Sequence, residues 1–374
     1  MLSKLHGFMS RHKRKFVVGG LVVGGAVLVT TYAQRKLLKW QEKEAQEFFE
    51  RIQRESHFKS TERNCNLTIT SLSETLRETI LTLVNTEDVL SKIRSGEGNK
   101  IELWDNLKVM VFTQISTLLY AGLMLVIVLR IQLNVMGGYL FRFKMEAHDS
   151  DQAPSAACQE CYLSLCNYFI NQGIKDLCSI IDKHVRLVMK DMSLKEKMSL
   201  QDIEQIFWSI QSSLSQDPLD PLKHLSKYLL QPFPPENLAM RDTVFMKKIF
   251  YETIDILDSA EVVSLAESSI KRCYSNTVDR ITAYYIPSPN GVVQVVSREN
   301  GFRTQAEQED EPFKNVTELR VPLAKIVPII HGLAKSSAST RQMDTWIEQY
   351  LVMDKINTLG ANLYEAFSYK QISL

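Results

Sequence analysis

The sequence predicts an all-α protein, a large helical bundle domain on a single N-terminal transmembrane helix. Apolar residues recur at three- and four-residue steps along most of the chain, and clusters of Gly, Pro and polar residues separate these stretches. One uncharged run near the start is long enough to cross a bilayer. With 374 residues, of which 45% are hydrophobic and 23% charged, the chain has the composition of a globular protein with a substantial core.

Positive charge is concentrated at the N-terminal end. Residues 1–41 contain eight Lys and Arg and no acidic residue, so the remaining chain carries 36 basic and 43 acidic residues. A nucleic-acid-binding protein normally spreads Lys and Arg over one face of its folded domain, and this chain does not. We expect a short basic head at residues 1–15, a transmembrane helix at 16–33 and one helical domain at 34–374.

The uncharged run Phe16–Ala33 predicts the transmembrane helix, because its 18 residues span about 27 Å as an α-helix. A cleaved signal peptide, with Arg11–Lys15 as its basic region, is one alternative, and "TTYAQ" is a poor cleavage site for it. A buried core helix is the other, disfavoured by the basic residues at both ends and by the glycines. Gly20 and Gly24 form a GxxxG spacing, which is a weak signal for helix pairing.

A charged helix is expected to follow the membrane segment directly, with Leu37, Trp40, Phe48 and Ile52 as its apolar stripe. Further helical patterns cover residues 71–94, 99–136, 158–190, 199–214, 241–285 and 341–367. The long breaker segment at residues 286–312 favours a mobile loop over a short hairpin.

A second apolar run, Val109–Leu129, holds 21 uncharged residues and qualifies by length as another transmembrane helix. Thr113, Ser116, Thr117 and Tyr120 nevertheless give it one semi-polar side. This pattern favours a central bundle helix that is enclosed almost all round.

Cysteine usage bears on the cellular compartment. The chain has six cysteines, and its two sequons at Asn66 and Asn315 leave a secreted or ER-lumenal helical protein open. Four cysteines fall within one helical segment, at Cys158, Cys161, Cys166 and Cys178. Cysteines on one helix rarely reach disulfide geometry, so reduced core residues and a cytosolic domain are favoured. The Cys158-x-x-Cys161 pair has no second pair with matching spacing, and we expect no metal site.

Motifs that carry catalysis are absent from the sequence. It contains no GxxxxGK[ST], no GxGxxG after a strand, no HExxH and no GxSxG, and its seven histidines do not cluster along the chain. We therefore expect a binding platform without cofactor or small-molecule substrate. A membrane-anchored enzyme, built from residues far apart in the sequence, stays open as an alternative.

A helix start is predicted at Asn99, where Glu102 three residues later forms a capping-box arrangement. One side of that helix carries Trp104, Leu107, Lys108, Val111 and Ile115. Either Trp104 packs into the bundle, or the end of this stripe stays open as an aromatic anchor for a partner's amphipathic helix, rimmed by Lys100 and Lys108.

Several blocks resemble the peroxin-3 family of peroxisomal biogenesis factors. They are "NKIELWDNLK" around Trp104, "LRIQLNVMGGYL" at Leu129–Leu140, "VPLAKIVPIIHG" at Val321–Gly332 and "ANLYEAFS" at Ala361–Ser368. The N-terminal order of a basic cluster, one apolar span and a charged helix also resembles that family, and the similarity runs nearly end to end. Residues 144–315 carry no family motif.

The resemblance implies an integral peroxisomal membrane protein with one N-terminal span, a cytosolic all-helical domain and possible transit through the endoplasmic reticulum. Its partners would be peroxisomal membrane lipid and peroxin-19, a soluble chaperone and receptor whose N-terminal amphipathic helix contacts a tryptophan that matches Trp104. The implied partner-binding residues are Trp104, Leu107, Lys108, Lys100, Asn134, Leu140, Leu323 and Lys325. The implied targeting residues are Arg11, Lys13, Arg14 and Lys15.

Overall fold

The computed structural model describes residues 13–146, 153–231, 239–282, 284, 319–335 and 346–369, with the helical backbone alone at 13–31 and 33. The chain divides into two units, Met1–Lys59 and Ser60–Leu374. Helix α2 (Lys13–Leu83) supplies the described part of the first unit and the start of the second. Every side chain from Gln34 to Gln53 is exposed, so the folded unit begins later than the predicted boundary at residue 34.

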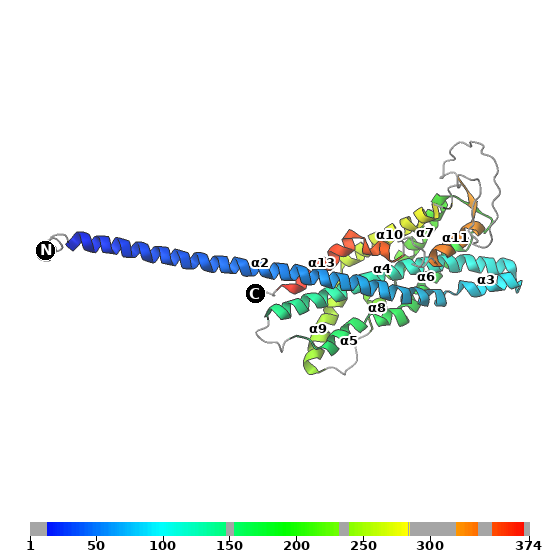
Figure 1. Ribbon diagram of the computed structural model, residues 1–374. Coiled ribbons are helices and arrows are strands. Elements are labelled where there is room, and N and C mark those ends of the chain that lie inside the picture. The colour runs from blue at the N-terminus through cyan, green and yellow to red at the C-terminus, as the bar shows by residue number, and fades with distance from the viewer. Residues whose placement is uncertain are drawn as a thin grey trace, which may run out of the picture. The chain divides into compact units, whose positions relative to one another are not determined.

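Helix α4 (Lys100–Glu146) is the centre of the larger unit, with α6 (Ile174–Met189), α11 (Leu323–Lys335) and α13 (Asp354–Ser368) packed against it (Figure 1). Among the residues whose side chains the structure describes, it is the one helix that is long and apolar enough to cross a membrane, yet its most apolar 18 residues are entirely buried within the fold. The buried interpretation of Val109–Leu129 is therefore confirmed.

Three polar side chains of α4 form hydrogen bonds inside the bundle. Thr113 donates to Asp182 Oδ1 at 3.2 Å, Gln114 donates to the carbonyl of Val84 at 3.1 Å, and Gln132 donates to the carbonyl of Tyr162 at 2.9 Å. A lipid-facing helix would leave such groups without partners, whereas neighbouring helices supply them here.

The cysteine-rich segment, predicted as one helix over 158–190, is broken. It consists of α5 (Ala156–Ser164), the π-helical turn η2 (Phe169–Gly173) and α6. At the junction Gly173 lies so close to Tyr228 that an added Cβ would stand 1.9 Å from the Tyr228 carbonyl oxygen. This contact with the end of another element, invisible in the local sequence, accompanies the irregular turn.

Three further helices belong to the larger unit: α7 (Leu200–Ser215), α9 (Met240–Leu257) and α10 (Ala260–Thr282). Ser199 and Asp202 cap α7 reciprocally, which agrees with the predicted helix at 199–214. The predicted helix at 241–285 is interrupted instead, because α9 ends at Leu257 and Ser259 accepts a hydrogen bond from Val262 N at 3.3 Å. The short helix α8 (Leu225–Leu229) lies between α7 and α9 in the chain.

The remaining elements are short. Strands β1 (Lys197–Met198) and β2 (Val321–Pro322) pair antiparallel directly before α11, a helix that the periodicity of the sequence did not predict and that contains Pro328. Helix α12 (Glu348–Leu351) precedes α13, and α3 (Thr86–Ser95) connects α2 to α4. The all-α prediction is confirmed, and the loop expected at 286–312 lies outside the described residues.

Candidate functional site

The start of α4 is a capped, exposed helix end. Asn99 Oδ1 accepts a hydrogen bond from Ile101 N at 3.1 Å, and its Nδ2 donates to Glu102 Oε1 at 2.8 Å. The predicted cap is therefore present, with Glu102 bonded to the Asn99 side chain instead of its backbone. Gly96 and Gly98, both at positive φ, provide the left-handed conformations that turn the chain from α3 into α4.

Apolar and basic side chains are exposed in the first turn of this helix. Ile101 is 78% exposed and Lys100 is exposed, while Trp104 is half-buried against the core. Trp104 therefore packs partly into the bundle and keeps part of its side chain accessible, while its role as an anchor for a partner's helix stays a prediction. We call Lys100, Ile101 and Trp104, together with Lys325, the docking region.

Lys108 does not lie at an open rim, and this expectation is corrected. Its side chain is 1% exposed, and its Nζ donates to Asp105 Oδ1 at 2.7 Å, to Met189 O at 3.1 Å and to Met192 O at 2.7 Å. The amine satisfies carbonyls at the end of α6, which otherwise lack an intrahelical donor. Leu107, 2% exposed, is likewise a core residue.

The segment after α6 joins α4 to α11. Lys108 donates to the carbonyl of Met189, the last residue of α6, and to that of Met192 in the following segment. In the same segment Leu194 O accepts a hydrogen bond from Ala324 N at 3.0 Å, and Glu196 O accepts one from Leu323 N at 2.9 Å. Leu323 is fully buried, and Lys325, in the first turn of α11, is exposed. The fold therefore connects the predicted residues of α11 to those at the start of α4, although more than 200 positions separate them.

Asn134 and Leu140 do not join this region. They lie 30 and 36 residues beyond Trp104 on the same helix, which places them about 45 and 54 Å away along its axis. Asn134 is buried and donates to the Arg130 carbonyl at 2.8 Å, and Leu140 packs partly against the core. The structure therefore does not bring these two implied partner-binding residues together with Trp104.

A polar clasp holds α11 against the α2–α3 junction. Thr86 Oγ1 and His331 Nε2 lie 2.9 Å apart, and Lys335 forms an ion pair with Glu87. Burial lowers the pKa of His331, which favours the neutral ring in that hydrogen bond. No sequence signal marks these contacts, since their partners are about 245 residues apart.

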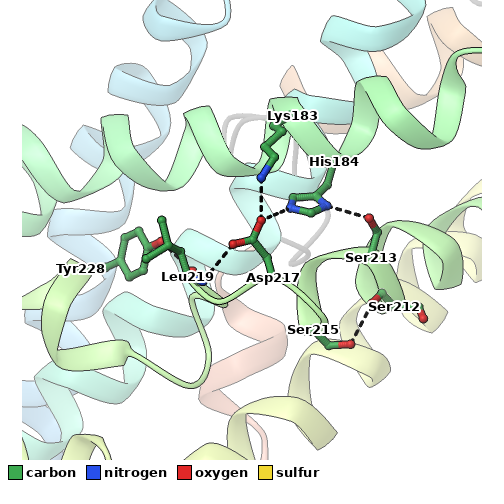
Figure 2. Close-up of polar contacts among 8 residues, drawn as sticks. All are labelled: Lys183, His184, Ser212, Ser213, Ser215, Asp217, Leu219 and Tyr228. Atoms are coloured by element: carbon green, nitrogen blue, oxygen red, sulfur yellow. Dashed lines mark hydrogen bonds and ion pairs between the residues drawn. The ribbon is translucent and has the colours of Figure 1, made fainter.

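Figure 2 shows a second polar cluster, which sequence reasoning missed because its members come from three segments. His184 of α6 is hydrogen-bonded through Nδ1 to Ser213 Oγ at 2.6 Å and through Nε2 to Asp217 Oδ2 at 2.9 Å. Lys183 Nζ donates to the same carboxylate oxygen at 2.7 Å, and Leu219 N donates to Oδ1 at 2.9 Å. The interior of the bundle is thus not purely apolar.

The order Ser213, His184, Asp217 resembles a charge-relay chain, but its surroundings favour a structural role. The carboxylate is held by a lysine and a backbone N–H in addition to the imidazole. The 240 Å³ pocket beside it is lined by Ser212 and Ser215 of the same helix and not by Ser213. We interpret the cluster as a staple that fixes the loop after α7 to α6.

Asp217 makes this staple pH-dependent. Hydrogen bonds from Lys183, Leu219 N and His184 hold the pKa of Asp217 well below its usual range of about 4. A carboxyl group with a lower pKa in the folded than in the unfolded chain stabilises the fold above about pH 4, and this stabilisation is lost as the pH falls. Asp217→Asn is expected to lower the urea midpoint at pH 7, with the difference from the parent narrowing at pH 3.

Asp255→Asn is the matched control, because Asp255 is exposed and no hydrogen bond or ion pair is described for it. Its difference from the parent is expected to stay small at each pH. A difference between Asp217→Asn and the parent that is the same at pH 7 and pH 3 would contradict the role assigned to this carboxylate.

Buried Arg130 organises a third polar cluster, between α4, α2 and α13. Its Nη2 donates to Asn66 Oδ1 at 2.6 Å and to Asn357 Oδ1 at 2.9 Å, and its Nη1 lies 3.9 Å from Glu62 Oε1. Asn66, the first sequon asparagine, is therefore a half-buried helical residue whose amide is already engaged. This geometry argues against the ER-lumenal alternative; Asn315 lies outside the described residues.

All six cysteines are free thiols. Burial raises the pKa of Cys65, Cys158, Cys166 and Cys178 to about 11 and that of Cys273 to about 12. These groups stay protonated and unreactive near pH 7, as expected of packing residues. Among the described residues no group of three or more His, Cys, Asp or Glu is placed to hold a metal ion.

Comparison with models of protein families identifies the family of this chain. The model of the family described as Peroxin-3 matches residues 7–100, 94–152 and 140–366. The chain belongs to the peroxin-3 family. The match includes the docking region, the buried central helix and residues 144–315, where no family motif had been recognised.

Individual relatives cover the whole chain. It is 29% identical to peroxisomal biogenesis factor 3 of Homo sapiens and 30% identical to that of Cricetulus longicaudatus, with 99% of each chain covered. Peroxisome biogenesis protein 3-2 of Arabidopsis thaliana is 22% identical over 73% of this chain and 81% of its own length. Membership of the peroxin-3 family supports a role in peroxisome biogenesis and describes a biogenesis factor, not a known enzyme.

Proposed function

We propose that this protein is a docking receptor of the peroxisomal membrane, which binds the import receptor peroxin-19 and so supports insertion of peroxisomal membrane proteins. The proposal rests on the membership of the peroxin-3 family and on one observation, the exposed Ile101 and half-buried Trp104 at the capped start of α4. An apolar side chain beside a rigidly held tryptophan is the kind of anchor that an amphipathic helix buries.

Binding requires no covalent chemistry. A partner segment that folds into a helix on docking loses conformational entropy, and a preformed apolar surface offsets that cost because the receptor itself need not reorganise. The core side of Trp104 and the bonded amine of Lys108 hold this end of α4 in place before any partner arrives. Lys100 and Lys325, both exposed, would attract an acidic partner and raise the association rate more than the final affinity.

The membrane anchor remains part of the proposal. Residues 16–33 would form the single span, most of the chain would face the cytosol, and Arg11, Lys13, Arg14 and Lys15 would form the targeting signal. Arg11 lies outside the described residues, while the other three begin α2 with their side chains undescribed.

Trp104→Ala tests the docking assignment. In the full chain held in detergent micelles, we expect the dissociation constant for a fluorescent peptide from the N-terminal segment of peroxin-19 to rise by about 30-fold or more. A tryptophan anchor is typically worth at least about 2 kcal/mol, which corresponds to that factor. Fluorescence anisotropy measures the binding, and circular dichroism checks that helical content and the melting temperature are retained.

Trp208→Ala is the control, because Trp208 is 58% exposed on α7 and lines a pocket with Tyr120, about 24 Å beyond Trp104 along α4. It is expected to bind the peptide like the parent. Undiminished binding by Trp104→Ala would remove this residue from the interface, and loss of the folded state would show that its role is packing.

A further inference from the structure

Large apolar side chains are exposed on the part of α2 that follows the predicted membrane segment. They are Tyr32, Leu37, Leu38, Trp40, Phe48, Phe49 and Ile52. Each is at least 46% exposed, and the larger unit of the fold begins only at Ser60. An exposed apolar surface of this size on one helix is typical of an interaction site.

Three of these side chains, Leu38, Phe48 and Ile52, fall on a regular seam. Steps of four and three residues alternate without interruption along Gly20, Gly24, Val27, Thr31, Gln34, Leu38, Gln41, Ala45, Phe48 and Ile52. No position in this series is charged. The mean step of 3.5 residues is the repeat by which helices pack in a left-handed coiled coil. We call these ten residues the α2 seam.

Two of the other exposed apolar residues flank the seam, whereas Tyr32 and Trp40 lie outside it. Leu37 and Phe49 flank it and widen the apolar face, whereas the charged residues Lys36, Lys43 and Glu50 fall at the positions farthest from it. Over more than four heptads a straight helix of 3.6 residues per turn would drift by about 20° per heptad away from such a seam. Supercoiling around a partner helix removes that drift and keeps Phe48 and Ile52 in line with Gly20.

The chemistry of the seam fits a second copy of the same chain in parallel orientation. In a symmetric parallel pair each seam residue meets its own copy. The amides of Gln34 and Gln41 each carry a donor and an acceptor, so they can pair with themselves, and polar seam residues of this kind fix the register. Gly20 and Gly24 would allow close approach within the membrane segment.

We propose that two copies of this protein associate through the α2 seam as a parallel, left-handed coiled coil that continues from the membrane span to Ile52. The parallel orientation rests on the proposed membrane anchor, which would keep both copies level in one bilayer. The pairing involves none of the docking-region residues, so a dimer would present two separate docking regions.

Light scattering on the full chain in detergent micelles tests the pairing. We expect the parent to have the protein mass of two chains, and the double variant Leu38→Glu with Ile52→Glu to have the mass of one. The dissociation constant of the dimer is expected to rise by more than about tenfold in this variant, which corresponds to 1.4 kcal/mol. Trp40→Glu is the matched control: Trp40 is 59% exposed and Leu38 57%, but Trp40 lies off the seam. It is expected to remain a dimer.

Cysteine cross-linking tests the register. Gln41→Cys places two thiols opposite each other and is expected to give a covalent dimer under mild oxidation, while Lys43→Cys, on the outer side, and the parent are expected to stay monomeric on a denaturing gel. If lipid covers the exposed apolar residues of α2 instead, the parent would have the protein mass of one chain, and this result would overturn the proposal. A mass of three or more chains, or equal cross-linking of both variants, would do so as well. Binding of the peroxin-19 peptide by the double variant at Leu38 and Ile52 is measured in a separate experiment, and its affinity is expected to equal that of the parent.

Discussion

Replacing Lys108 with methionine is expected to lower the free energy of unfolding by about 1–3 kcal/mol. The amine is 1% exposed and donates to the carbonyl oxygens of Met189 and Met192. Met189 O also accepts from Met192 N at 3.3 Å, so the variant leaves Met192 O without its donor. A buried acceptor deprived of its partner costs about 1–3 kcal/mol, and burial of the apolar methionine side chain offsets only part of that cost. Urea unfolding followed by circular dichroism measures the change.

Lys100→Met is the control, because Lys100 is exposed at the first position of α4. It is expected to change the free energy of unfolding by no more than about 0.5 kcal/mol, the range of ordinary surface substitutions. Equal stability of the Lys108 and Lys100 variants would contradict the structural assignment of Lys108. In that case a direct role of the amine in partner binding would be favoured again.

Gly173→Ala is expected to destabilise the fold by about 3 kcal/mol or more. The added Cβ would stand 1.9 Å from the carbonyl oxygen of Tyr228 and 3.2 Å from Phe169 Cδ2. The nearer atom is backbone, so η2 or α8 must shift to accommodate it, and overpacking of this kind commonly costs about 1–3 kcal/mol. The gain in helix propensity from glycine to alanine, at most about 1 kcal/mol, is too small to offset it.

Gly332→Ala provides the opposite expectation within the same protein. Gly332 lies inside α11, and no atom of the residues that the structure describes stands within 4 Å of the position of its added Cβ. Only the propensity effect remains, so this variant is expected to be more stable by up to about 1 kcal/mol. The urea midpoints of the two alanine variants should therefore lie on opposite sides of the parent, and a Gly173→Ala midpoint at or above the parent would refute the close contact.

These two positions bear on how the docking region is held. Lys108 fastens the end of α6 beneath the first turns of α4, and Gly173 allows α6 to begin against Tyr228. Both act on α6, which packs against α4, the helix that carries Trp104. A rigid support lowers the entropic cost of binding, because the anchor does not have to be ordered by its partner.

Local sequence patterns determined the helical fold class, the cap at Asn99 and the buried nature of Val109–Leu129. Each follows from neighbours along the chain: periodic apolar residues, an Asn three positions before a Glu, and a semi-polar side on an otherwise apolar helix. The family blocks around Trp104 are likewise readable without a structure. The predicted order of helices needed correction mainly at irregular turns such as η2 and the break after Leu257.

Only the tertiary structure decided which residues of one helical face are accessible. Trp104, Leu107 and Lys108 share a side of α4, yet Leu107 and Lys108 are buried and Trp104 is only half-buried. The amine of Lys108 is bonded to the end of α6 and to the segment after it. Asn134 and Leu140 belong to another sequence block that resembles the peroxin-3 family. They lie about 45 Å or more from Trp104, because α4 is one uninterrupted helix. The staple of His184 and Asp217 joins residues 33 positions apart. Periodicity determines which way a side chain faces on its own helix, whereas its exposure depends on what packs there from elsewhere in the chain.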